Sequence, residues 1–314
     1  MVIVPPGAAS GRKTSARARA LDGLRGIAAV VVGFYHAILF NDHSLLNRVL
    51  YVPLQTLHTA RDIVTKVFLA TLNGEISVLI FFVLSGCVLR QSLERRGDQP
   101  GRSLVAAFAA VRAVRIYAPL LVCLVFFYAV SLLHVGSFPR FTPMQLAENA
   151  TLARIAMHGA TWTLRVEMLA VPFIALAWLW RRRFGVVSFV PLLAYGCYVI
   201  FEPAWIFRWY TFSQCLLEFL LGMFVAEPFL RPAFARHGRW ACLVAGAALF
   251  VPRAFLWHAW LGGLVIQCVA AATMVGCLFH GGRLPSSGFS NGRASRRRAG
   301  SASAITSTTC LPCG

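Results

Sequence analysis

Arg25 and His36 stand in the first apolar stretch of the chain, and their residue types could bind an anion and move a proton. They are eleven residues apart, so at about 100° per residue both lie on one face of a helix, about 16 Å apart along its axis. A histidine can take a proton from a hydroxyl near neutral pH, and an arginine can hold a phosphate with two hydrogen bonds. The same pair also fits a topology-setting charge and a hydrogen-bonded packing residue, so both interpretations stay open.

Three further ionisable residues adjoin apolar stretches and could join this chemistry. Arg112 and Arg115 are one helical turn apart at the predicted cytoplasmic start of a span, where they could clamp a phosphate or simply anchor the helix. Glu167 begins another apolar run, so it lies either at the outer rim or buried beside a cation such as Arg165 or Arg154. A buried carboxylate there could position or assist a general base.

Four other residues stand out by their places in the apolar runs. Ser85 precedes Gly86, and this pair of small residues permits close helix packing, which is the default role for the serine. Trp162 fits a membrane-interface anchor, and Glu75 fits the outer rim, where a carboxylate costs little. Glu218 falls in mid-span, where a charge is costly, so we keep it as a lower-ranked functional candidate.

These residues stand in or beside long apolar stretches, which must therefore position them. Of the 314 residues, 58% are hydrophobic and only 13% are charged. A soluble globular protein carries about 25% charged residues, so this chain has too few to cover a soluble core. The stretches are continuous rather than alternating, which predicts membrane-spanning helices and not barrel strands. We therefore expect an all-α, polytopic transmembrane bundle of about eight spans, near residues 24–41, 70–89, 117–134, 165–180, 186–201, 210–228, 240–256 and 259–279.

The arginines gather in short blocks between these stretches, which explains the net charge of +19 without a nucleic-acid partner. A cytoplasmic N-terminus places 22 of the 30 Lys and Arg residues on the cytoplasmic side and eight outside. This bias favours a cytoplasmic N-terminus over the reverse orientation. In that orientation Arg25 lies near the inner membrane surface and His36 lies well inside the membrane.

The two ends differ in composition from the predicted membrane domain at residues 21–280. Residues 1–20 are basic and contain no acid, as in the cytoplasmic segment of an uncleaved signal anchor, and an organellar transit peptide has a similar composition. Residues 281–314 predict a disordered basic tail, or the product of a truncation or a shifted reading frame. Seven of the nine cysteines lie singly in apolar runs, and the CxxC formed by Cys310 and Cys313 has no second pair, so we expect no disulfide framework and no metal site.

Four segments occur in an order and spacing known from one family of membrane enzymes. Leu21–His36 is similar to an opening Arg-x10-His signature, and Phe81–Gly86 is similar to an FFxLSG segment. Arg112–Ile116 is similar to a cytoplasmic RxxR segment, and Trp162–Glu167 is similar to a W-S/T-L-x-x-E segment. Each is weak alone. Together, in this order, they resemble the membrane acyltransferase 3 family over most of the chain.

The resemblance implies a membrane-bound O-acyltransferase that moves an acyl group, often acetyl, from acyl-CoA to a hydroxyl. Acyl-CoA would be the donor substrate rather than a bound cofactor. The common acceptors are sugars of surface polysaccharides, lipid-linked glycans or small glycosides. The chain would be a multi-pass protein of the bacterial cytoplasmic membrane, in contact with its lipids.

The resemblance also implies roles for the residues singled out above. His36 would be the general base or an acyl relay, and Arg25 would bind the donor or stabilise developing negative charge. Arg112 and Arg115 would face the phosphates of CoA, while Glu167 would support the acceptor or orient a catalytic group. The supporting residues would be Ser85 and Trp162.

Two alternatives stay open beside the transferase. Family members have about ten spans and a late Ser-Tyr-x-x-Tyr-Leu-x-His pattern, which this chain does not show, so an inactive truncated paralogue or scaffold is one alternative. A transporter or flippase is the other, with a proton or substrate path along Arg25, His36, Glu167 and Glu218. A transferase would consume the thioester of acyl-CoA, whereas a transporter would move a solute without consuming it.

Overall fold

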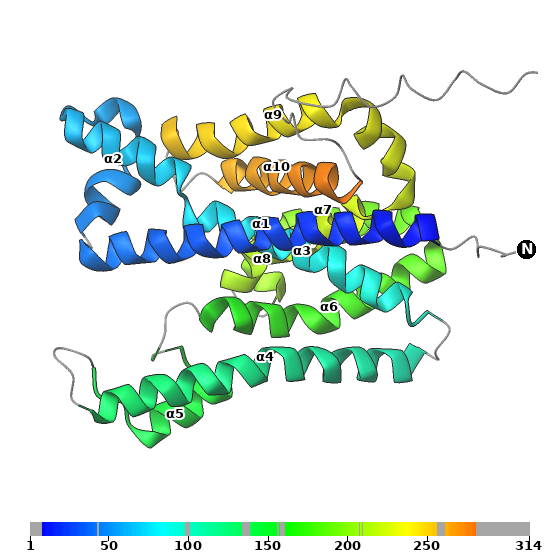
Figure 1. The fold of residues 1–314 in the computed structure, drawn as a ribbon, viewed down its shortest axis with the longest axis horizontal. Coiled ribbons are helices and arrows are strands. Elements are labelled where there is room, and N and C mark those ends of the chain that lie inside the picture. Colours follow the sequence, from blue (N-terminus) through cyan, green and yellow to red (C-terminus); the bar gives the residue numbers. More distant parts are fainter. Residues whose placement is uncertain are drawn as a thin grey trace, which may run out of the picture.

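The computed structural model describes an all-helical bundle, as the apolar stretches predict, and its long helices run roughly along one common axis (Figure 1). The predicted tail at 281–314, with its CxxC, and the first seven residues lie outside the described residues. The described residues are 8–42, 44–97, 101–133, 139–155, 157, 161–206, 208, 210–255 and 261–280.

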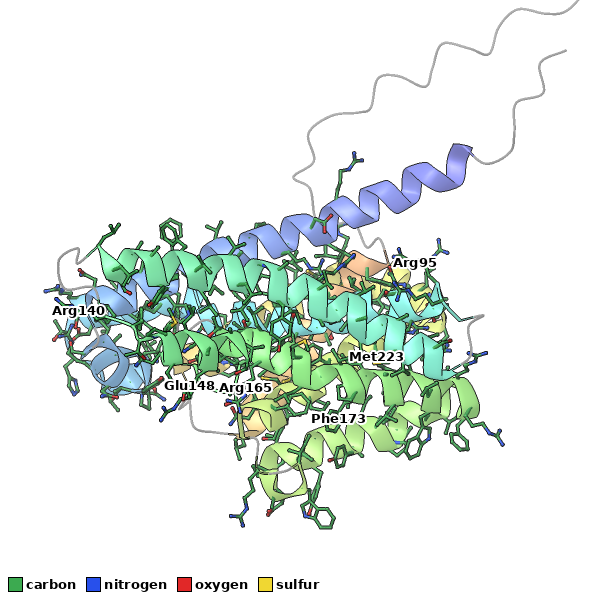
Figure 2. All side chains as sticks on the ribbon, turned by 90° about the horizontal axis from the view of Figure 1, so that it is seen from below. Arg95, Arg140, Glu148, Arg165, Phe173 and Met223 are labelled. Carbon is green, nitrogen blue, oxygen red and sulfur yellow. The ribbon has the colours of Figure 1, made fainter. Side chains whose placement is uncertain are left out.

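Ten α-helices form the described part of the bundle, and short 3-10 or π-helical turns connect several of them. Each predicted span overlaps at least one of these helices, whereas α5 lies in none of the predicted ranges. Figure 2 shows α1 extending past the rest of the bundle at one end. The helices are α1 (Ala8–Asn41), α2 (Ala60–Thr71), α3 (Gly74–Glu94), α4 (Gly101–Leu132), α5 (Pro143–Ala150), α6 (Trp162–Phe184), α7 (Phe189–Phe201), α8 (Tyr210–Val225), α9 (Arg231–Phe255) and α10 (Leu261–Phe279).

Fewer of these helices meet the length and hydropathy of a membrane span than the sequence predicts. Five do so, and a pair made of Thr211–Val225 and Pro228–Pro252, bent by 70°, adds a sixth if it counts as one span. Helix α7 has only 13 residues, fewer than the roughly 17 that a span needs. The predicted count of about eight spans is therefore not confirmed, and the cytoplasmic N-terminus stays a prediction.

Helix α3 lies at the centre of the bundle, between α1, α6, α8 and α10. It starts where the Asn73 side chain accepts hydrogen bonds from the backbone N–H groups of Glu75 and Ile76, which are otherwise unsatisfied at a helix start. Its closest approach is to α8. A Cβ added to Gly86 would collide with a backbone carbonyl of α8, and one added to Gly222 would collide with a backbone carbonyl of α3. The expected close packing at the Ser-Gly pair is thus confirmed.

Helix α4 begins earlier than the sequence suggests, at Gly101 rather than near residue 117. The sequence predicts only the membrane span, near residues 117–134, and the helix extends beyond it toward the N-terminus. Arginine and alanine are good helix formers, so the helix continues through them. Arg112 therefore lies eleven residues inside α4, about 16 Å from its start, and within the candidate span Ser103–Leu132.

Candidate active site

The carboxylate of Glu167 in α6 joins three helices. Ser85 of α3 donates its hydroxyl to Glu167 Oε1 at 3.0 Å, and Arg112 of α4 donates Nη2–H to Glu167 Oε2 at 2.6 Å. The side chain of Glu167 is 19% exposed and that of Arg112 is 14% exposed, so the pair is shielded from most solvent screening. Three of the four segments that the sequence singles out therefore meet at one carboxylate.

The cation that pairs with Glu167 is not one of those expected from neighbouring sequence. Arg154 pairs instead with Glu148 of α5, at 3.5 Å. Arg165 lies near the start of α6, where Figure 2 labels it. Arg112 is 55 residues away in sequence from Glu167, and it becomes a neighbour because α4 packs against α6. Local spacing carries no signal for such a pair.

Two more arginines lie close enough to Arg112 to interact with it electrostatically, Arg25 of α1 and Arg115 of α4. Arg25 has a weak pairing with Asp22 at 3.9 Å, and Arg115 is exposed. The buried Nε of Arg112 has no acceptor among the described residues. The three guanidinium groups of Arg25, Arg112 and Arg115 outnumber the two carboxylates of Glu167 and Asp22. This excess of positive charge can bind an anionic group.

A ring contact holds α6 in register with α3. Trp162, the first residue of α6, meets the ring of Phe82 edge-on with centroids 6.0 Å apart, and Phe82 also contacts Phe219 of α8 at 5.0 Å. Trp162 is partly buried against the core, so it packs inside the bundle instead of serving only as a surface anchor. Its contact with Phe82 lies one turn along α3 from the bond between Ser85 and Glu167.

His36 takes no part in these contacts. It is exposed on α1, its ring meets that of Tyr35 edge-on at 5.9 Å, and no hydrogen bond joins it to another residue in the described ranges. Arg25 precedes it on the same helix by eleven residues, or about 16 Å. The structure therefore places Arg25, but not His36, beside Arg112.

A buried ionic network was missed by sequence reasoning. Glu227, 1% exposed, accepts bonds from Arg181 Nε and Nη2, the second at 3.0 Å, and lies 3.3 Å from Arg90 Nη2. Arg90 is also 1% exposed and pairs with Glu94 at 2.6 Å. The sequence predicts these arginines as topology-setting charges, but they tie the ends of α3 and α6 to the bend between α8 and α9. Glu227 stands 46 residues after Arg181 in the sequence, so local spacing gives no signal for this network.

Glu218 lies apart from the Glu167 contacts, in α8 against α10. Its side chain is 1% exposed, the thiol of Cys268 donates to its Oε1 at 3.6 Å, and no cation pairs with it among the described residues. An unpaired charge inside a membrane is costly, so we expect the uncharged carboxylic acid. Within the same described ranges, no group of three or more His, Cys, Asp or Glu residues is placed to hold a metal ion.

Comparison with known protein families gives one match. A family model described as an acyltransferase domain matches residues 19–303, a range that includes all four segments discussed above. Neither the curated proteins nor the solved structures include a match. The family, together with the five apolar helices of span length, indicates an integral membrane protein with an acyltransferase domain. The chain therefore belongs to the acyltransferase 3 family.

Proposed function

We propose that this protein moves an acyl group, most simply acetyl, from acyl-CoA to a hydroxyl of a glycan or lipid-linked sugar at the bacterial cytoplasmic membrane. Family membership supports acyl transfer in general. The observation that carries the finer proposal is the Glu167 carboxylate, bound by Ser85 and Arg112 inside the bundle. The excess positive charge around it favours a donor that bears phosphates, as acyl-CoA does.

In this proposal Glu167 is a positioning residue. Its two oxygens already accept hydrogen bonds from Ser85 and Arg112, so it holds a guanidinium group in place instead of taking a proton from the substrate. The guanidinium group of Arg112, with those of Arg25 and Arg115, then binds the donor's phosphates.

His36 is the proposed general base. Its imidazole takes the proton of the acceptor hydroxyl while the hydroxyl oxygen forms a bond to the acyl carbon. The carbon–sulfur bond of the thioester breaks, and the CoA thiolate leaves and receives that proton. The exposed position of His36 leaves the imidazole open to the acceptor. The separation of about 16 Å between Arg25 and His36 along α1 suits a long donor that is held at one end and reacts at the other.

Replacing His36 tests the mechanism. In isolated membranes, His36→Ala is expected to lower transfer of a labelled acyl group from acyl-CoA by about 10²- to 10⁴-fold, because general-base catalysis contributes that much. The exposed His58 offers a matched control, and His58→Gln should transfer at the wild-type rate. Full transfer by His36→Ala, at equal protein level, would falsify this role. Mass spectrometry of surface glycans from cells with and without the gene then identifies the acceptor by one lost acyl group.

Glu218 is the observation that favours a second candidate, a transporter or flippase. Carboxylates within a membrane often serve proton paths, and Glu218 lies fully buried without a cationic partner among the described residues. Proteoliposomes supplied with acyl-CoA separate the candidates. A transferase releases free CoA in proportion to acylated product, a transporter accumulates solute with the thioester intact, and an inactive paralogue does neither.

A further inference from the structure

Helix α1, which carries His36, is held to the bundle along one narrow seam. Among the described side chains of α1, four are buried, namely Leu21, Ala28, Tyr35 and Leu39. The first three follow one another at intervals of seven residues, which is almost two full turns, so they lie on one face of the helix. Tyr35 is the largest of the four and is 4% exposed. Its contacts therefore have a large part in setting how α1 is turned about its own axis.

The ring of Tyr35 lies against Gly74, the first residue of α3. Gly74 is held in place because Asn73 caps α3 immediately before it. A Cβ added to Gly74 would lie 2.5 Å from Cδ1, 2.9 Å from Cγ and 3.1 Å from Cβ of Tyr35. Non-bonded carbon atoms pack at about 3.5–4.0 Å, so a side chain at this position would push against α1. Because the Cβ of Tyr35 is fixed to the backbone of α1, turning the ring away would not relieve all of the crowding.

His36 follows Tyr35 directly, so it lies about 100° further around α1, at the edge of the seam. Its side chain is exposed, and its ring meets that of Tyr35 edge-on with centroids 5.9 Å apart. No hydrogen bond to another residue of the described ranges fixes the imidazole. The direction of His36 therefore depends on the backbone of α1 and on the neighbouring ring of Tyr35.

We propose that Gly74 is a positioning residue for acyl transfer and that it acts through Tyr35. The missing Cβ lets the Tyr35 ring lie against the start of α3, and this contact turns α1 so that His36 points to the acceptor hydroxyl. The inference rests on the proposed role of His36 as general base. Arg25 lies about 16 Å from His36 along α1, so a displacement at Tyr35 changes proton transfer more than it changes donor binding.

Gly74→Ala in the full-length protein tests the proposal by steady-state kinetics of acyl transfer in lipid vesicles. We expect kcat to fall by about 10- to 100-fold, because a misplacement of about 1 Å can cost that much, while KM for acyl-CoA stays within about twofold. The matched control is Gly276→Ala, whose Cβ would lie 2.5 Å from Cζ of the Phe234 ring, between α10 and α9. It overpacks another helix pair against a ring and should keep the wild-type kcat. A wild-type kcat in Gly74→Ala, or an equal fall in both variants, overturns the proposal.

The position of His36 is read without acyl transfer by nuclear magnetic resonance of protein with 13C-labelled histidine. The His36 signal is the one that disappears in His36→Gln. Gly74→Ala should shift this signal, because the ring current of Tyr35 acts on it, and Gly276→Ala should leave it in place. An unshifted signal in Gly74→Ala overturns the proposal even where transfer falls. A wild type that transfers no acyl group refutes the proposed function instead, and the signal still decides whether Gly74 sets the position of His36.

A second background keeps the test valid if Gly74→Ala alone does not fold. Tyr35→Ala removes the Cγ and Cδ1 atoms that the new methyl group would meet, and it should itself lower kcat with KM for acyl-CoA unchanged. Adding Gly74→Ala to Tyr35→Ala should then lower kcat by less than about twofold, because residues in contact give non-additive effects. A full additional loss in the double variant would show that Gly74 does not act through Tyr35.

Discussion

At the scale of single residues, the contacts of Glu167 decide what this carboxylate can do. A carboxylate that already accepts hydrogen bonds from a hydroxyl and a guanidinium holds both donors in place. It is well suited to fix the direction of Arg112. Removing the charge of Glu167 should therefore lower the rate of acyl transfer by releasing Arg112, while the shape of the site stays nearly the same.

Glu167→Gln tests that role. The amide keeps the size of the side chain, but Arg112 loses its counter-charge. We expect acyl transfer at low acyl-CoA concentration to fall by about 10- to 100-fold, as for loss of one hydrogen bond to a charged group of the donor. We expect a stability loss of about 1–3 kcal/mol, below the 3–5 kcal/mol typical of a fully buried pair, because both side chains keep some exposure.

The measurements are the rate of acyl transfer in membranes and thermal unfolding in detergent. Glu148→Gln is the control, since Glu148 pairs with the exposed Arg154 at 3.5 Å, and such pairs contribute about 0–1 kcal/mol. A Glu167→Gln protein that unfolds more easily yet transfers at the wild-type rate would show that Glu167 has a structural role only.

At the scale of helices, the crossing of α3 and α8 sets the position of the site. Gly86 and Gly222 let the two backbones touch, and Ser85 adjoins this contact in sequence. Any side chain at the crossing has to push the helices apart, because the atoms it would meet belong to backbone carbonyls. A wider crossing would move α3, and Ser85 with it, relative to Glu167 on α6.

Gly86→Ala should separate α3 from α8. The added methyl group meets the carbonyl oxygen of Phe219, and overpacking of this kind costs about 1–3 kcal/mol. We expect a lower melting temperature in detergent and reduced acyl transfer. Gly246→Ala is the control, because a Cβ there meets nothing within 4 Å and alanine is the better helix former by about 1 kcal/mol. Equal melting temperatures for the two variants would contradict the close crossing.

At the scale of the whole molecule, the bundle has one end marked by Arg95 and another marked by Arg140, and Figure 2 shows these residues far apart along its length. Both are exposed. The distribution of cations predicts that the Arg95 end faces the cytoplasm and the Arg140 end faces outward.

Cysteine labelling checks the orientation. In a cysteine-free background, Arg140→Cys should react with a membrane-impermeant maleimide in intact cells. Arg95→Cys should react only after the membrane is made permeable. Labelling is read by the mass shift of the purified protein, with total cysteine measured after denaturation as the control for expression. The reverse pattern would show that the positive-inside bias does not set the orientation of this chain.

Sequence reasoning predicts much of the fold and part of the candidate site. The apolar stretches locate the helices, and the segments around Ser85, Arg112 and Glu167 are the ones that meet. It does not predict that α4 begins at Gly101, because arginine and alanine continue a helix beyond its apolar stretch. It also misses the network of Glu227 with Arg90 and Arg181, because the partners stand on different helices.

The sequence by itself determines that this chain forms apolar helices within a membrane. Hydrophobicity and helix formation are local properties, set by residues close together in the sequence. A backbone in lipid must also satisfy its own hydrogen bonds, which a helix does. Only the tertiary structure decides which charges compensate one another. Arg181 and Arg182 are adjacent in sequence, yet the first is bound to Glu227 and the second is exposed on an aromatic ring. That difference depends on how α6 packs against the bend after α8, which no local pattern specifies.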